Sequence, residues 1–152
     1  SSTHPSHFLQ IWIVPDRQGL PPSYEQIHVP VTERQGQLRL IGSPTGQDGA
    51  VTIHQDVYLY ASVLTNGETV TYDLGVDIPE ESLRERRELR SGKPMAWIQV
   101  VRGVVELKDA TQPDSNPQLL KAGDGVAITA LPKIQFTGAS DHAELLLFDL
   151  AA

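Results

Sequence analysis

The chain alternates short apolar runs with turn-forming stretches over most of its length. Apolar residues fall at every second position within residues 50–64, with a kink near 54–56, and similar runs recur at 37–43 and 143–150. A period of two is typical of strands that bury one face. Further strands are expected at 69–76, 95–101, 104–109, 121–129 and 133–139. Short strands at this spacing predict an all-β barrel or sandwich with at most one short helix.

Two tight turns are predicted to join neighbouring strands into hairpins. The Asn-Gly dipeptide at 66–67 is the strongest short hairpin signal, so we expect the strands on either side of it to pair. The Arg-Gly dipeptide at 102–103 separates the strands expected at 95–101 and 104–109. This arrangement predicts a second hairpin.

Residues 8–14, FLQIWIV, are apolar on both alternating faces except at Gln10. Such a run predicts a strand that is buried on both sides, and Pro15 would end it. A strand of this kind is an aggregation liability when it is left in water. We therefore expect it to be covered, either by this domain or by a second copy. Exchange of the strand between copies would give a homodimer.

Residues 77–94 form the polar, helix-friendly part of the chain. A short helix is expected near 79–89, with Pro79 in its first turn. The basic run RERRELR at 84–90 is interrupted by two glutamates. It is either a mixed-charge surface in solvent or a patch for an anion or a partner.

Composition narrows the classes of function. The chain has 152 residues, which fits one domain, and its net charge of −7 argues against non-specific binding of nucleic acid. It has no cysteine, which excludes disulfides, zinc–thiolate sites and cysteine nucleophiles and fits a cytoplasmic location. No stretch approaches 18 consecutive apolar residues, so no membrane-spanning helix is expected.

Three stretches together resemble the pirin family. They are HFLQIWIVPDRQGLPPSYEQ at 7–26, GAVTIHQDVYLYASVL at 49–64, and AWIQVVRGVVEL with the later AGDGVAI and AELLLFDL within 96–150. The likeness is strongest to bacterial members described as quercetin-dioxygenase-like, and it extends in order over almost the whole chain. It implies a cupin barrel of the RmlC-like jelly-roll type. It also implies a full-length protein of two such barrels, with an iron-type divalent metal in the first.

The resemblance also implies a division of the chain. In the family, the segment that matches HFLQIWI closes the first barrel and leads into the second. Residues 1–23 are therefore expected to be the last strand of an N-terminal cupin that this chain lacks, followed by a linker. Residues 24–152 are expected to form a C-terminal pirin-type cupin. A first residue that is serine rather than methionine fits this interpretation. The family's metal ligands come before this segment, so none of them is carried over.

The cupin motifs of this second barrel are expected to lack metal ligands. Gly103 takes the place of the last glycine in G-x5-H-x-H-x3–4-E-x6-G, but Ala96 stands where the motif has glutamate and residues 89–92 hold no histidine. The histidine of the second motif would fall near Thr137. Imidazole and carboxylate are the ligands that a first-row divalent metal needs. The resemblance therefore implies no cofactor in this chain.

Six residues are candidates for a ligand pocket, and none is a candidate for catalysis. His54 and Asp56 flank Gln55 at the kink, where they either fix the bend by hydrogen bonds or line a pocket. Aromatic residues could line the mouth of the barrel, or they could be core and cross-strand packing. The candidates are His54, Asp56, Tyr58, Tyr60, Trp97 and Phe136.

Three hypotheses for the function follow. The first is a metal-free C-terminal half that supports a metal-bearing N-terminal cupin, in a family that resembles iron-dependent quercetin 2,3-dioxygenase. The second is a free-standing cupin that binds a small aromatic ligand or a protein. The third is an enzyme with an unusual metal site that uses His4, His7 or His54. Pro5 bars the first two histidines from chelating on a helix, and a linker role is the simpler interpretation.

Overall fold

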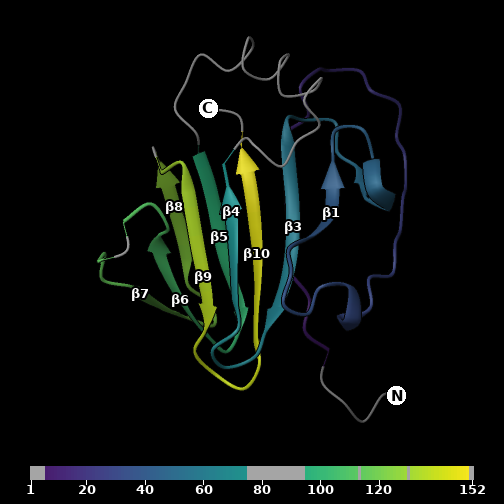
Figure 1. Cartoon of the computed structure of the whole chain (residues 1–152). Helices are drawn as coiled ribbons and strands as arrows, with labels where there is room; N and C mark the ends of the chain where they lie inside the picture. Colours follow the sequence, from purple (N-terminus) through teal and green to yellow (C-terminus); the bar gives the residue numbers. More distant parts are fainter. Residues whose placement is uncertain (1–5, 75–94, 113, 130, 151–152) are drawn as a thin grey trace.

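Two β-sheets face each other across a single apolar core (Figure 1). This computed structural model describes residues 6–74, 95–112, 114–129 and 131–150. Among these residues, no helix is long and apolar enough to cross a membrane. The helix expected near 79–89 and the basic run at 84–90 lie outside these residues. The described elements are η1 (Val31–Glu33), β1 (Arg39–Ser43), η2 (Gln47–Gly49), β2 (Val51–Thr52), β3 (Val57–Leu64), β4 (Thr69–Asp73), β5 (Met95–Arg102), β6 (Val104–Asp109), β7 (Gln118–Lys121), β8 (Gly125–Thr129), β9 (Lys133–Gly138) and β10 (Ala143–Leu150).

The larger sheet has six strands in the order β2-β1-β3-β10-β5-β8. Its central strand β10 pairs antiparallel with β3 along its whole length, from Ala143 opposite Leu64 to Leu150 opposite Val57. On its other side β10 pairs with β5. Alternate residues of β10 point to opposite faces of the sheet, so one apolar set enters the core and another reaches the outside.

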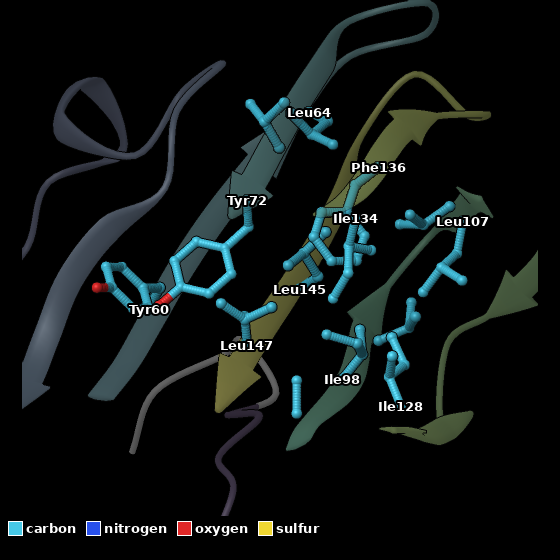
Figure 2. Packing of buried hydrophobic residues seen from close by; sticks show 14 of the residues in the cluster. Tyr60, Leu64, Tyr72, Ile98, Leu107, Ile128, Ile134, Phe136, Leu145 and Leu147 are labelled. Atoms are coloured by element: carbon cyan, nitrogen blue, oxygen red, sulfur yellow. The ribbon is translucent and has the colours of Figure 1, made fainter. Parts of the chain in front are cut away.

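The smaller sheet has four strands in the order β4-β9-β6-β7, and its inward side chains complete the core. Figure 2 shows side chains of both sheets interdigitating between them. Full burial of a large apolar side chain contributes about 2 kcal/mol each, so this layer is the main source of stability. These observations confirm the all-β fold that the alternation predicts. The largest fully buried apolar residues are Tyr72, Phe136, Leu64, Ile98, Ile134, Leu145 and Leu147.

The two predicted hairpins are wrong. β4 follows β3 after the turn at Gly67, yet β4 pairs with β9 while β3 pairs with β1 and β10. In the same way, β5 and β6 meet at Gly103 but lie in different sheets. Both glycines have positive φ, 82° and 69°, as tight turns often require. Such a turn reverses the chain without fixing which strand becomes the partner, and here both turns are corners between sheets.

The expected doubly buried strand at 8–14 is also wrong for the described chain. This segment forms no strand, and Phe8 and Trp12 are 81% and 86% exposed. A strand needs a partner edge with unpaired backbone groups. Here the segment instead lies against the face of the six-stranded sheet, where it meets side chains and no unpaired backbone groups with which it could form a strand. In Figure 1 the purple N-terminal trace runs along the side of the barrel near β3 and β1. Covering by a second copy stays a prediction.

Candidate functional site

A buried polar cluster lies inside the barrel. The hydroxyl of Tyr72 on β4 donates a hydrogen bond of 2.9 Å to Oδ2 of Asp149 on β10, which is fully buried. The rings of Tyr60 and Tyr72 lie 5.1 Å apart at an angle of 58°, a tilted contact typical of aromatic pairs. Figure 2 shows these two rings together at one end of the core. The hydrogen bond therefore ties the smaller sheet to the larger one.

The environment keeps Tyr72 protonated. Burial, with smaller contributions from the Asp149 carboxylate and from Tyr60, raises the pKa of Tyr72 far above its ordinary value of 10.0. A hydroxyl held in this form donates its proton to the hydrogen bond with the carboxylate and keeps it at neutral pH. This cluster is thus suited to fixing the two sheets rather than to transferring a proton.

Asp149 was not among the residues expected from the sequence, although the signal was present. In the β10 alternation it is in phase with Ala143, Leu145 and Leu147, all of which are buried. A charged residue in phase with the buried set is the exception that most often has a specific partner. The signal was incomplete, because Leu146, Phe148 and Leu150 make the other alternate set of β10 just as apolar, so alternation alone does not decide which face is the inner one.

The residues that the structure describes do not fit a cupin metal site. Ala96, which replaces the motif glutamate, points into the interior opposite Asp149 and offers only a methyl group. Thr137 lies on the outward face of β9, where its hydroxyl is 3.0 Å from that of Thr69. In the described part of the chain no group of three or more histidine, aspartate or glutamate residues could hold a metal ion. His4 lies outside that part.

The six candidate pocket residues do not come together in one cavity of the described chain. Tyr58 and Tyr60 point into the core from β3, and Phe136 joins them there from β9. Trp97 lies on the opposite, outer face of the six-stranded sheet and is 39% exposed. His54 is exposed at the bend before β3. A ligand role for these residues stays a prediction.

The bend at residues 54–56 holds the N-terminal segment by hydrogen bonds. The amide of Asp16 donates to the carbonyl oxygen of His54 at 2.8 Å, and the Gln55 side chain donates to the carbonyl oxygen of Val14 at 3.0 Å. Gln55 also accepts a hydrogen bond from the amide of Asp56 at 2.8 Å. These contacts agree with the interpretation of this triplet as an element that fixes the bend.

The outer face of the six-stranded sheet is apolar and incompletely covered. Residues 9–13 lie beside it and leave a groove of about 330 Å³ against Trp97 and Phe148. A second groove of about 360 Å³ lies between Trp12, Val14 and Met95. The alternation predicted that these strands have two faces but not that both would be apolar. We call this surface the outer apolar face, defined by Val57, Leu59, Trp97, Leu146, Phe148 and Leu150.

Known proteins are similar to this chain in sequence and in fold. Residues 40–78 and 80–150 match the family described as quercetinase C-terminal cupin domain. The chain is 35% identical over 150 residues to a quercetin 2,3-dioxygenase of Escherichia coli K12, and 32% identical over 147 residues to a pirin-like protein of Caulobacter vibrioides. These alignments cover 99% and 96% of this chain but 53% of each relative.

A solved structure agrees with these matches. The crystal structure of the bacterial pirin YhhW from E. coli in complex with nickel(II) superposes with a TM-score of 0.69 at 30% identity, over 92% of this chain and 48% of that protein. The chain thus spans about half the length of the relatives it matches. The family match, the sequence identity and the shared fold show that the chain belongs to the pirin family, within the group of domains described as quercetinase C-terminal cupin domain.

Proposed function

We propose that this chain is the metal-free, structural half of a two-barrel protein, in which it supports a metal-bearing cupin of the quercetin 2,3-dioxygenase type. The observation that carries the proposal is the interior of the barrel. Where the cupin motif has a carboxylate ligand, Ala96 is fully buried among apolar side chains. The relatives named for the dioxygenase activity are almost twice as long as this chain, so the metal is expected in their other half.

The outer apolar face supports this role. A sheet face in a free-standing domain is usually polar, and an extended apolar patch marks a surface that another element covers. Residues 8–14 lie along this face but leave grooves on both of their sides. We therefore assign the outer apolar face to contact with the preceding barrel of a longer chain.

A chimera tests this proposal. This chain is joined in frame behind the part of the E. coli relative that precedes the matched region, and quercetin consumption and bound metal are measured. We expect activity and about one metal ion per chimera, and neither in this chain alone. Leu146→Lys should lower the activity at least about tenfold, because a lysine buried without a partner costs several kcal/mol. Thr71→Lys on the polar sheet is the matched control.

Two results would contradict the proposal. The first is stoichiometric iron, nickel or zinc in this chain alone, which would restore a metal site here. The second is an equal effect of Leu146→Lys and Thr71→Lys in an active chimera, which would show that the outer apolar face contacts nothing.

A second candidate function is a free-standing module that binds a small apolar ligand. The groove beside Trp97 favours it, because its lining combines an indole ring with aliphatic side chains, as ligand pockets commonly do. Quercetin added to the chain alone should then quench the fluorescence of Trp12 and Trp97, which both line this groove, in a saturable manner, and Phe148→Ala should abolish the saturation. Linear quenching in both proteins would exclude this function.

A further inference from the structure

A second kind of groove lies at the opposite end of the six-stranded sheet from Trp97. It encloses about 580 Å³ and runs between the N-terminal segment, the end of β5 and the start of β10. Arg102 ends β5, and Glu144 lies opposite it in the antiparallel register. Arg34, which follows η1, and the imidazoles of His7 and His142 complete its polar lining. We call this the basic groove; it shares Leu146 with the outer apolar face, so a ligand site here rests on the proposed function in that the preceding barrel must leave the groove open.

The basic groove has more positive than negative charge. Glu144 accepts a hydrogen bond from Nη1 of Arg34, and its other oxygen lies 3.8 Å from Nε of Arg102. One carboxylate therefore faces two guanidinium groups, which leaves one excess positive charge before either histidine is considered. In a chain with a net charge of −7, this local excess favours an anion.

The Nε groups of Arg34 and Arg102 in the basic groove lack hydrogen-bond acceptors among the described residues. Nε of Arg34 is buried and has no hydrogen-bond partner among the described residues. The side chain of Arg102 is 55% exposed, and its Nε is too far from Glu144 for a hydrogen bond. A buried N–H without an acceptor is unfavourable, so a small shift of the Arg34 side chain that brought its Nε to a ligand oxygen in the groove would favour binding. Guanidinium groups bind carboxylates with two parallel hydrogen bonds.

The walls of the basic groove select the rest of the ligand. Its floor includes the apolar side chains of Val101 and Leu146, and the N-terminal segment adds further apolar surface. A bare inorganic anion would leave this surface wet, whereas an aromatic or aliphatic body would cover it. We propose that the basic groove binds a small organic carboxylate, with the carboxylate at Arg102 and Arg34 and the apolar body on Val101 and Leu146.

Benzoate is the probe for this site, and its binding to the full 152-residue chain is measured by calorimetry and by shifts of backbone amide NMR signals. Arg102→Gln should raise the Kd about tenfold, because it removes a charge-assisted hydrogen bond. Glu144→Gln should lower the Kd about threefold, because it removes the carboxylate that competes for both arginines. Lys121→Gln, an exposed change of the same charge on the four-stranded sheet, should leave the Kd unchanged.

The opposite signs for Arg102→Gln and Glu144→Gln distinguish a ligand site from a structural ion pair, since loss of a purely structural pair would weaken binding in both variants. Benzyl alcohol, which lacks the charge, and inorganic phosphate, which lacks the apolar body, should each bind at least about tenfold more weakly than benzoate. Several outcomes overturn the proposal: equal binding of benzoate and phosphate, no effect of Arg102→Gln, or benzoate-induced shifts centred on Trp97 instead of Val101. If Glu144→Gln fails to fold, the Kd of Arg102→Gln and the binding of benzyl alcohol and phosphate still test whether the basic groove binds an organic carboxylate.

Discussion

The two outer faces of this barrel use the same strand alternation but end in different chemistry. On the four-stranded sheet the outward residues are polar and pair across strands, as the hydroxyls of Thr69 and Thr137 do at 3.0 Å. The ion pair between Lys133 and Asp73, at 3.2 Å, lies on the same face. On the six-stranded sheet the equivalent positions of β10 hold Leu146, Phe148 and Leu150.

This difference teaches which surface the molecule is built to cover. Cross-strand polar pairs contribute only a few tenths of a kcal/mol each, but they leave their face stable in water without a partner. The outer apolar face has no such arrangement, and residues 8–14 cover only part of it. The four-stranded sheet therefore has an outer surface that is stable in water, whereas the outer apolar face of the six-stranded sheet requires another element to cover it.

The largest expected effect comes from the corner that separates the two faces. An added Cβ at Gly103 would collide with the carbonyl oxygen of His142, and its φ is positive. Gly103→Ala should cost about 3 kcal/mol of unfolding free energy. Gly67→Ala, at a corner of similar φ where an added Cβ meets nothing, should cost about 1 kcal/mol. Chemical denaturation measures both, and equal losses would refute the assignment of Gly103 as a crowded corner.

The next effect breaks the tie between the sheets. Tyr72→Phe removes the donor to a buried carboxylate and should cost about 2 kcal/mol, whereas the outward Thr71→Ser should cost less than about 0.5 kcal/mol. The pKa of Tyr72 is raised in the folded state, so its contribution is complete below about pH 10 and is lost as the pH rises further. Tyr72→Phe should therefore flatten the fall in thermal stability above pH 10. An unchanged alkaline profile would contradict this assignment.

A change in the segment that lies against the outer apolar face should alter association more than stability. Trp12 is 86% exposed beside both grooves, and Tyr24 is 83% exposed away from them. Trp12→Gln should change the unfolding free energy by less than about 0.5 kcal/mol but reduce binding of a hydrophobic dye and self-association in sedimentation. Tyr24→Gln is the matched control. If both variants lower dye binding equally, the outer apolar face is not the surface that binds the dye.

The smallest effect concerns the corner near Gly67. The Glu68 carboxylate accepts hydrogen bonds from the amide of Thr65 at 2.7 Å and from Gln35 at 2.5 Å, and its contacts with Thr65 are the main reason that its pKa is lowered. A lowered pKa in the folded state gives stability above the ordinary value of 4.5 that is lost as the pH falls. Glu68→Gln should therefore flatten the fall in melting temperature between about pH 5 and pH 3. Glu106→Gln, on the polar face, should leave the slope as it is.

The sequence predicted the strands better than their partners. Residues 143–150 were expected as a strand and form β10, because a largely apolar run of this length that follows a turn carries a strong signal. No strand was predicted at β7, because only Leu120 of its four residues is buried and a single apolar residue shows no alternation. Pairing depends on the return path of the whole chain, which the local turn at Gly103 does not encode.

The site was harder to predict than the fold for a related reason. Alternation identifies two faces but not what covers each, so the sequence placed Trp97 either at the barrel mouth or in core and cross-strand packing and did not indicate its half-exposed position on the outer face opposite Phe148. The basic groove joins Arg34, Arg102 and Glu144, which are far apart in the sequence and carry no motif. Only the folded arrangement shows that these charges share one carboxylate.

The corners also set the order in which this barrel can form. Because the strand that follows β3 enters the other sheet, β3 must wait for β10, about eighty residues later, before it gains its longest partner. Folding that depends on such distant pairings is slow, because the entropy of closing a long loop is lost before the favourable contacts between the strands can form. During synthesis on the ribosome, β3 and β5 could not be joined into one sheet until β10, the strand between them, had emerged. Until then the apolar side chains of β3 and β5 would depend on chaperones to keep them from aggregating.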